Sequence, residues 1–545
     1  MSAEMVLKNG VIYSLDGKKA ESLAISEGKV KKIGSDKEVE SLIGEDTYVI
    51  DLKGKAVVPG FNDTHVHLVG YGAAINAVDL NGVSSIDELI TKCKDFIDEK
   101  QIDPGKWVYG RGWNQNLFVA DGKRFPTNED LDKISTEHPI LLIRVCGHIG
   151  LSNSKALQNV GITEDTFIAG GSFDKNSAGK PNGIIREASL EWYKKNIVPK
   201  PSLEDIKISI LSGAQELLKW GVTSIHSEDS YDLGYGGDFM DIYKAYKELE
   251  TEGRLPLRVY QKVSLPKHED IEKFLKTGLR TGDGSNFYKI GPVKQWCDGT
   301  MGARTAALTE GYSDDPENRG ILVYEEEELY QNILLAHNSG MQVCLHAIGD
   351  RALSTVLNAY ERVISESNLP HRHRIVHCQV GNLGLYEKLA RLGISINIQP
   401  LSTASDLNMM NSRLGSDREK ESHNWRTITD LGVCISASSD VPVELPNVFY
   451  GIHAIVNRKD LNDKPKNGWL PEQAVTVEEA LKMYTINSAW NEFEEEIKGT
   501  LTEGKLADMV ILDKDPLMVD SGSIKDIRVL ATLIDGKIMY GESNI

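Results

Sequence analysis

The stretch VVPGFNDTHVH, residues 57–67, decides how the rest of the chain is interpreted. Its β-branched, apolar beginning predicts a strand, and the two histidines near its end are separated by one residue. Side chains of an extended segment alternate between two faces, so His65 and His67 point the same way. Two neutral imidazoles on one face can bind a metal such as zinc. A His-x-His pair alone is a weak signal, so the prediction depends on the rest of the chain.

Length and charge limit the class of protein. A chain of 545 residues is too long to fold around a single ordinary hydrophobic core, so two or three domains are expected. Its 61 basic and 80 acidic residues give a net charge of −19, which disfavours nucleic acid or an anionic membrane as a partner. The first residues lack the pattern of a signal peptide, and no apolar run is long enough to span a membrane. We therefore expect a cytoplasmic protein with a small-molecule substrate.

The cysteines are scattered along the chain without a Cys-x-x-Cys pair, and most lie in apolar, strand-like runs. This pattern predicts buried free thiols in a reducing compartment. The six are Cys93, Cys146, Cys297, Cys344, Cys378 and Cys434.

Both ends of the chain predict short strands joined by tight turns. Neither end has enough apolar faces to form a core alone. We therefore expect residues 1–55 and 495–545 to build one composite β-sandwich domain. The turn signals are Asn9-Gly10, Asp16-Gly17, Glu27-Gly28 and Asp535-Gly536.

The middle of the chain, residues 56–494, alternates apolar strands with helical patterns, which is typical of βα units. The α/β fold expected there is a (β/α)8 TIM-like barrel, because eight strands can be counted. They are 57–64, 222–226, 257–263, 288–296, 342–345, 374–377, 394–398 and 433–437. Helical stretches such as 203–220, 325–338 and 352–365 lie between them.

A long insertion of about residues 70–200 follows the first predicted strand. Barrels of this kind carry their chemistry in the loops after the strands. The insertion is then either a wall or lid of the pocket or a subdomain without a part in the site. The sequence leaves both interpretations open.

Potential metal ligands follow several of the predicted barrel strands. Each has an ordinary structural explanation, such as a satisfied strand-end histidine, a lysine that reaches solvent or an aspartate that caps a helix. Together they place nitrogen and oxygen donors around one end of the barrel, which predicts a metal site. The residues are His65, His67, Lys294, His346, His377 and Asp440.

Several phrases, in order along nearly the whole chain, resemble the amidohydrolase superfamily of metal-dependent hydrolases on a (β/α)8 barrel. The resemblance is closest to the family-3 branch that includes N-substituted formamide deformylases. The phrases are VVPGFNDTHVH, GHIGLSNSKAL at 147–157, VKxxxDG at 293–299, HAIGD, HCQ, SSDVP and GKLADMVILDKDP.

The resemblance implies roles for the matching residues. His65 and His67 would bind the more buried metal, with Asp440 also near it, and His346 and His377 would bind a second, more exposed metal. Asp440 would be the catalytic residue: it would take a proton from the attacking water and deliver it to the leaving nitrogen.

Lys294 lies where related enzymes carry an N6-carboxylysine that bridges two metals. Carboxylation needs a neutral amine, which burial favours. An unmodified Lys294 would favour a single-metal site instead. The expected cofactor is therefore one or two divalent ions, zinc by default, with manganese and iron as alternatives.

The reaction that the resemblance implies is metal-assisted hydrolysis of a non-peptide C–N bond in an amide, formamide or cyclic amide. Two alternatives remain open. One is a deaminase of the same superfamily, although no acid for ring protonation is evident. The other is a catalytically silent protein that acts by binding or regulation. The presence of a suitable residue at every metal-ligand position argues against it.

Candidates for substrate binding are His148, Arg144 and Arg304. His148 and Arg144 lie in the insertion, and structural hydrogen bonds or ion pairs explain them equally well. Arg304 follows the fourth predicted strand. His226 ends the second predicted strand without a metal role. Because barrels of this type often pair, we expect a homodimer.

Overall fold

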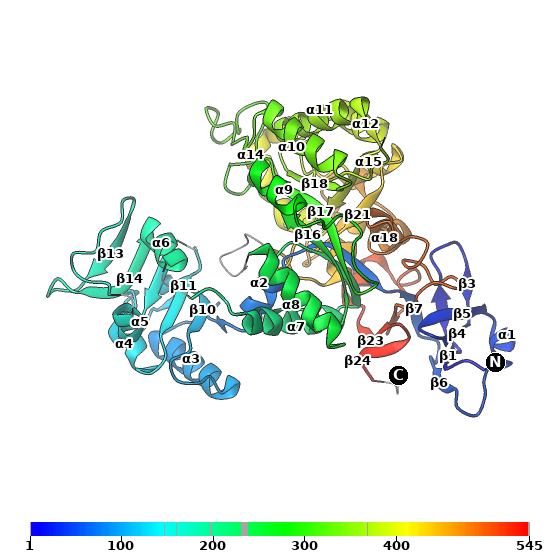
Figure 1. Cartoon of the computed structure of the whole chain (residues 1–545), viewed down its shortest axis with the longest axis horizontal. Helices are drawn as coiled ribbons and strands as arrows, with labels where there is room; N and C mark the ends of the chain where they lie inside the picture. Colours follow the sequence, from blue (N-terminus) through cyan, green and yellow to red (C-terminus); the bar gives the residue numbers. More distant parts are fainter. Residues whose placement is uncertain are drawn as a thin grey trace. The chain divides into compact units, whose positions relative to one another are not determined.

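The computed structural model describes residues 2–146, 148–159, 161–196, 199–229, 238–367 and 369–542. These residues form two compact units. Unit 1 contains the described residues up to Leu68 and from Ala214 onward, and unit 2 contains those from Val69 to Gly213. Figure 1 shows the helices and strands of the whole chain, coloured from the N-terminus to the C-terminus.

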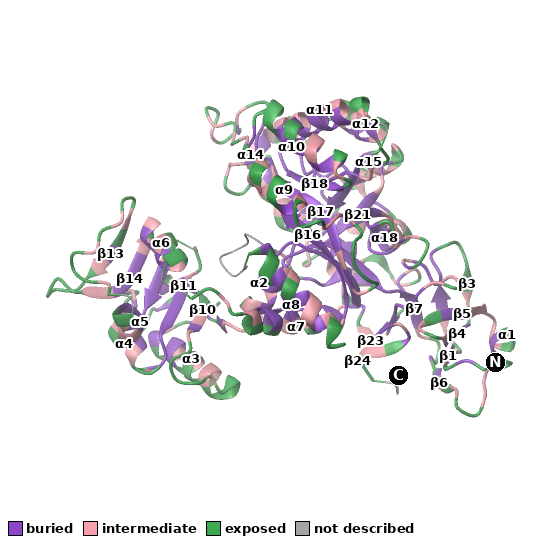
Figure 2. Ribbon diagram, in the orientation of Figure 1, coloured by how far each residue is buried: buried purple, intermediate pink, exposed green. Residues whose placement is uncertain are grey.

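Unit 1 contains eight consecutive parallel strands, each paired with the next, which confirms the predicted barrel. All eight are largely buried (Figure 2). Their order in the sheet follows their order in the chain. They are β8 (Phe61–Val66), β15 (Val222–Ser227), β16 (Arg258–Ser264), β17 (Tyr288–Trp296), β18 (Val343–Ala347), β19 (Arg374–His377), β20 (Ser395–Ile398) and β21 (Ile435–Ala437).

The barrel closes where the first strand meets the segment after the last. The amide of Asp440 donates to the carbonyl of His65 at 2.8 Å, and the amide of His67 donates to the carbonyl of Val441 at 2.9 Å. The hydroxyl of Thr64 also donates to the carbonyl of Ala437 at 2.9 Å. These bonds place the carboxyl end of β8 beside the loop that follows β21.

Helices lie between the barrel strands, and the three helices predicted there are confirmed as α7, α10 and α11. Helix α12 illustrates how the sequence sets their ends: the Asn382 side chain accepts from the amide of Leu385, and Gly393 ends the helix at φ 64°. The helices are α7 (Leu203–Lys219), α8 (Phe239–Thr251), α9 (His268–Leu275), α10 (Glu326–Asn338), α11 (Asp350–Glu366), α12 (Leu383–Leu392), α13 (Ser402–Asp406), α14 (Met410–Arg418), α15 (Trp425–Asp430), α16 (Val448–Asn457), α17 (Val477–Met483) and α18 (Ile486–Asn491).

Strands from both ends of the chain build the predicted sandwich, which also belongs to unit 1. One sheet has the order β5-β4-β1-β6, and the other has the order β24-β23-β22-β7-β2-β3. In the second sheet the C-terminal strand β22 pairs antiparallel with the N-terminal strand β7 (Figure 1). The strands are β1 (Met5–Lys8), β2 (Val11–Tyr13), β3 (Lys19–Ala20), β4 (Ser22–Ser26), β5 (Lys29–Gly34), β6 (Tyr48–Asp51), β7 (Ala56–Pro59), β22 (Met509–Leu512), β23 (Val529–Ile534) and β24 (Lys537–Gly541). The short helix α1 (Asp36–Glu40) follows β5.

Two predictions for the N-terminal part are wrong. The single strand expected at 57–64 is two strands, β7 in the sandwich and β8 in the barrel, which meet at Gly60. A Cβ at Gly60 would lie 2.3 Å from Thr223 Oγ1, so the close approach there requires glycine. Asn9-Gly10 does not make a hairpin, because β1 and β2 belong to different sheets and the chain crosses between them. The other three predicted hairpins are confirmed.

Unit 2 is formed by the insertion and has its own sheet and its own buried cluster, which includes Leu89, Trp113 and Leu142. The sheet order is β13-β14-β12-β11-β10-β9. Its strands are β9 (Val78–Asp79), β10 (Val108–Trp113), β11 (Ile140–Arg144), β12 (Ile149–Ser152), β13 (Gly171–Lys175) and β14 (Pro181–Glu187). Its helices are α2 (Leu68–Ile75), α3 (Ile86–Lys100), α4 (Asn128–Asp132), α5 (Ser154–Asn159) and α6 (Ala188–Asn196).

All six cysteines are free thiols, but Cys146 lies exposed after β11, so the expectation of burial is wrong there. Among the described residues, no helix combines the length and apolar character needed to cross a membrane.

A buried ion pair links the sandwich to the barrel. Arg258, the first residue of β16, donates to both carboxylate oxygens of Asp508 at 2.6 and 2.9 Å, and to Asp535 at 2.5 Å. Arg258 and Asp508 are both buried, so removal of the Asp508 charge leaves a desolvated guanidinium with one acid instead of two.

We predict that Asp508→Asn lowers the free energy of unfolding by about 3 kcal/mol, as expected for a broken buried ion pair. The measurement is chemical denaturation followed by circular dichroism. Glu503→Gln is the control, because Glu503 pairs with Lys32 at the surface and such pairs contribute less than about 1 kcal/mol. Equal effects of the two changes would contradict this interpretation of the Asp508 contact.

Candidate metal centre

Two histidine nitrogens and one carboxylate oxygen converge at the seam of the barrel. His65 and His67 come from the end of β8, and Asp440 comes from the loop after β21. Asp440 Oδ1 lies 3.0 Å from His67 Nε2 and 3.4 Å from His65 Nε2. All three residues are buried. An aspartate oxygen shared by two imidazoles is a set of donors that suits a divalent metal.

Two further histidines extend the group. His377 ends β19, and its ring centre lies 5.7 Å from that of His65 and 4.4 Å from that of His346. His65, His377 and Asp440 offer one ligand atom each, all within 4.8 Å of one another. His346 comes from β18, and its Nε2 lies 3.2 Å from the carbonyl oxygen of Gly299 and 3.3 Å from Asp298 Oδ1.

Two buried lysines and a glutamate complete the interior of the site. Lys294 Nζ lies 3.0 Å from Glu228 Oε2, and both side chains are fully buried. Lys262 Nζ lies 2.6 Å from His65 Nδ1. Burial lowers the pKa of Lys262 to about 7.

Burial also sets the protonation of the histidines. It lowers the pKa of both His65 and His377 well below the ordinary value, with neighbouring positive charges adding to the effect. Both imidazoles are therefore neutral at physiological pH, which is the form that binds metal.

The backbone is strained where the ligands meet. His377, Cys378 and Asp440 have φ values of 76°, 53° and 60° in the left-handed region, which is unfavourable for residues with a Cβ. Asp63 helps to hold this geometry, because its carboxylate accepts from the amide of Ser439 at 3.0 and 3.1 Å. Burial raises the pKa of Asp63 to about 7, against the opposing effect of these donors.

The predicted substrate-binding residues lie in two different units. Arg304 belongs to unit 1, where its guanidinium is bound to Asp314 at 3.0 and 2.9 Å in an exposed loop. Arg144 and His148 belong to unit 2. Arg144 donates to Gln115 at 2.8 Å and to Asn114 at 3.3 Å, and His148 Nδ1 lies 3.1 Å from Glu187 Oε2. A role of any of the three in substrate binding stays a prediction.

His226, near the carboxyl end of β15, contacts side chains outside the group of predicted ligands. Its Nδ1 lies 2.7 Å from a guanidinium nitrogen of Arg374, the first residue of β19, and its Nε2 lies 3.7 Å from Glu492. Burial lowers its pKa to about 3. His226 is thus part of a structural charge network inside the barrel.

Sequence reasoning missed several residues of the site. Glu228 follows His226 by two positions and could have been found from strand alternation, which puts residues two apart on one face. Asp298 lies inside the VKxxxDG phrase and Gln399 directly follows a predicted strand. Lys262 had no signal other than its place in an apolar run.

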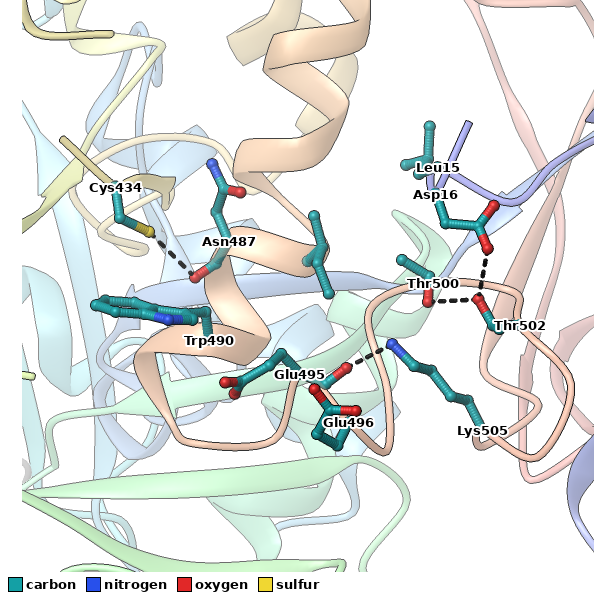
Figure 3. Close-up of a pocket in the computed structure, with 11 residues that line it drawn as sticks. Leu15, Asp16, Cys434, Asn487, Trp490, Glu495, Glu496, Thr500, Thr502 and Lys505 are labelled. Atoms are coloured by element: carbon teal, nitrogen blue, oxygen red, sulfur yellow. Dashed lines mark hydrogen bonds between the residues drawn. The ribbon is translucent and has the colours of Figure 1, made fainter. Parts of the chain in front are cut away.

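A pocket of about 570 Å³ lies elsewhere in unit 1 (Figure 3). Its walls include the turn at Leu15-Asp16, helix α18 with Trp490, and the segment from Glu495 to Lys505. Cys434, at its edge, precedes β21, whereas Asp440 follows that strand. The pocket is therefore at the opposite ends of the strands from the metal ligands.

Known proteins with similar sequences include amidohydrolases, which is consistent with a metal site formed by His65, His67 and Asp440. The chain is 33% identical over 539 residues to the putative amidohydrolase YtcJ of Bacillus subtilis, covering 98% of this chain and 99% of the relative. It is 27% identical over 559 residues to N-substituted formamide deformylase of Arthrobacter pascens, covering 98% of each chain.

An uncharacterized metal-dependent hydrolase from Pyrococcus furiosus has a similar crystal structure, with a TM-score of 0.77 and 31% identity. The match covers 94% of this chain and 99% of that protein. The model of the family described as "Amidohydrolase family" matches residues 48–540, which include His65, His67, Asp440 and the sandwich strands β6, β7, β22 and β23. The chain therefore belongs to the amidohydrolase family.

Proposed function

We propose that this protein hydrolyses a non-peptide C–N bond, in an amide, a formamide or a cyclic amide. The observation that carries the proposal is the convergence of Asp440 Oδ1 on His65 Nε2 and His67 Nε2 in a buried site. Similarity along the whole chain to an N-substituted formamide deformylase supports this choice of bond. The substrate itself follows from neither observation.

The residues present fit a divalent metal. Neutral imidazoles and a carboxylate suit zinc, and two polar atoms inside the site, Glu228 Oε2 and Lys294 Nζ, make no hydrogen bond with the described residues. His65, His67 and Asp440 would hold one ion, and His377, expected from the resemblance to bind a second ion with His346, would join them because its ligand atom lies within 4.8 Å of those of His65 and Asp440. A bound divalent ion lowers the pKa of water and polarises the scissile carbonyl group.

A second ion would need His346 together with Lys294. We propose that Lys294 is then carboxylated: the lone pair of its neutral amine forms a C–N bond to carbon dioxide, one C=O double bond of carbon dioxide becomes a C–O⁻ single bond, and the proton lost by the nitrogen passes to water. The product is a carbamate with two oxygen donors, whereas the unmodified ammonium has no free lone pair.

Neighbouring groups orient the ligand histidines. His67 Nδ1 donates to the carbonyl of Glu228 at 2.8 Å, and His377 Nδ1 donates to Gln399 Oε1 at 2.6 Å. Each bond places the proton on Nδ1 and leaves the Nε2 lone pair for a metal. The Gln399 amide is itself held, because its nitrogen donates to Ser438 Oγ at 2.9 Å.

Asp440 would serve as the general base and acid. A carboxylate can accept a proton from water beside the substrate carbonyl and pass it to the leaving nitrogen. The backbone of Asp440 is held in place, because its amide donates a hydrogen bond to the carbonyl of His65. This bond keeps the carboxylate that would accept the proton beside the two histidines.

We predict that Gln399→Leu weakens zinc binding about 10- to 100-fold, since loss of the partner of His377 frees its ring and its tautomer. The measurement is competition with a chromogenic chelator. Gln342→Leu is the matched control: Gln342 is also buried and hydrogen-bonded, but it lies just before β18, at the amino end of that strand. Zinc affinity equal to that of the wild type in Gln399→Leu would refute the proposed orienting role.

We predict that Asp440→Asn lowers hydrolysis by about 10²- to 10⁴-fold, the range expected for loss of general acid–base catalysis. The assay is a panel of N-substituted formamides, N-acyl amino acids, cyclic amides, dipeptides and amidines, with product identification by mass spectrometry. Asp417→Asn is the control, because the Asp417 side chain is fully exposed, and it should retain full activity.

Release of ammonia from amidines alone would favour the deaminase alternative, and cleavage of dipeptides alone would contradict the choice of a non-peptide bond. Inactivity of the metal-loaded wild type on the whole panel would favour a binding protein.

We predict that the protein purified with bicarbonate holds about two equivalents of metal, and that without bicarbonate it holds about one. Lys294→Met should hold about one in both conditions, because the carbamate needs the lysine amine. Elemental mass spectrometry gives the stoichiometry. One equivalent in every sample would show a single-metal site with an unmodified Lys294.

A further inference from the structure

We propose that Glu228 is a further ligand of the metal centre and supplies it with an oxygen donor. No motif in the sequence marks this residue, and the inference rests on the metal centre of the proposed function. Three observations support it: the position of its backbone, the unfilled bonding capacity of its side chain, and the charge balance of the site.

The backbone of Glu228 is fixed against the two histidines of β8. Its amide donates to the carbonyl of Val66 at 2.8 Å, and its carbonyl accepts from His67 Nδ1 at 2.8 Å. Residue 228 thus lies beside the segment that carries both His65 and His67, directly after the end of β15. The side chain is held inside the barrel, with no exposed surface.

The two carboxylate oxygens of Glu228 differ in their partners. Oε1 accepts from the hydroxyl of Ser264 at 2.9 Å, which fixes the orientation of the carboxylate. Oε2 accepts no hydrogen bond from any residue that the structure describes. It lies 3.0 Å from Lys294 Nζ and 3.8 Å from His65 Nδ1, and so borders the predicted ligands on the side of Lys294.

A carboxylate without full bonding partners is unfavourable in a buried site. The ion pair with Lys294 offsets part of that penalty, but the contact lacks hydrogen-bond geometry for either atom. Asp440 neutralises only one charge of a divalent ion, and the charge of Glu228 is balanced by Lys294 as long as that lysine is cationic. If Lys294 becomes a carbamate, Glu228 loses its cationic partner, and a metal ion can replace it.

Glu492, another buried glutamate of unit 1, provides a comparison, because its carboxylate interacts with protein groups in a purely structural role. Glu492 Oε1 accepts from Asn62 at 2.6 Å and pairs with Lys498 at 2.8 Å, and it lies 3.7 Å from His226. These partners hold the pKa of Glu492 down at about 2 despite its burial. Both glutamates pair with a lysine, but Glu492 Oε1 also accepts a hydrogen bond from Asn62, whereas Glu228 Oε2 makes the ion pair with Lys294 without a hydrogen bond from any described residue.

The test compares Glu228→Gln with Glu492→Gln, two changes that each remove one buried negative charge from the barrel. Zinc affinity is measured by chelator competition, and the ligand field by the visible absorption spectrum of the cobalt-substituted protein. We expect Glu228→Gln to bind zinc at least about tenfold more weakly and to change the cobalt spectrum. Glu492→Gln should keep the affinity and the spectrum of the wild type.

A Glu228→Gln variant with the affinity and cobalt spectrum of the wild type would overturn the proposal and leave the proposed function standing. A wild type that binds neither zinc nor cobalt would overturn both. If Glu228→Gln does not fold, Glu228→Asp takes its place: it keeps the charge and shortens the side chain. An altered cobalt spectrum then supports ligation, and an unaltered one shows that Glu228 is only the counter-ion of Lys294.

Discussion

The pair of backbone hydrogen bonds between β8 and the loop after β21 is the constraint on which the site depends. One joins the amide of Asp440 to the carbonyl of His65, and the other joins the amide of His67 to the carbonyl of Val441. They align two ligand-bearing segments that are more than 370 residues apart in the chain. The same two bonds close the barrel. Barrel closure therefore also brings His65, His67 and Asp440 together.

Burial accounts for the chemistry that this arrangement makes available. The imidazoles of His65 and His377 are neutral because the surrounding protein disfavours their charged forms. The same burial would leave Asp440, Glu228 and Lys294 poorly compensated if they were alone, and their closeness makes each a partner for another or for a cation. The left-handed φ values of His377, Cys378 and Asp440 show that the fold holds this geometry against local preference.

Much of the architecture could be predicted from hydrophobic patterns because barrel strands are short, buried and separated by helices. The predicted strands 288–296 and 374–377 coincide with β17 and β19. Patterns could not separate β7 from β8, since both halves of 57–64 are apolar or buried and the break is visible only in the pairing, where β7 joins the sandwich and β8 the barrel. The Asn9-Gly10 turn failed for a related reason: the local signal was right for a turn, but strand pairing is decided by tertiary packing.

Within the site, residues at strand ends were found because their chemistry is recognisable there. Gln399 and Asp63 were not predicted because they act by orienting another residue. An amide or carboxylate in that role has no characteristic distance in the sequence from the residue that it orients. Strand alternation could have placed Glu228 on the inner face, but its value as a donor depends on a carboxylate oxygen that accepts no hydrogen bond from its described buried neighbours. Such a property exists only in three dimensions.

The most direct test of the account is a crystal structure of the zinc-loaded protein with anomalous diffraction data at the zinc absorption edge. The account predicts an anomalous peak at the carboxyl ends of the barrel strands, bound by His65, His67 and Asp440. A peak at another set of residues, or none in crystals of protein that binds zinc in solution, would contradict it.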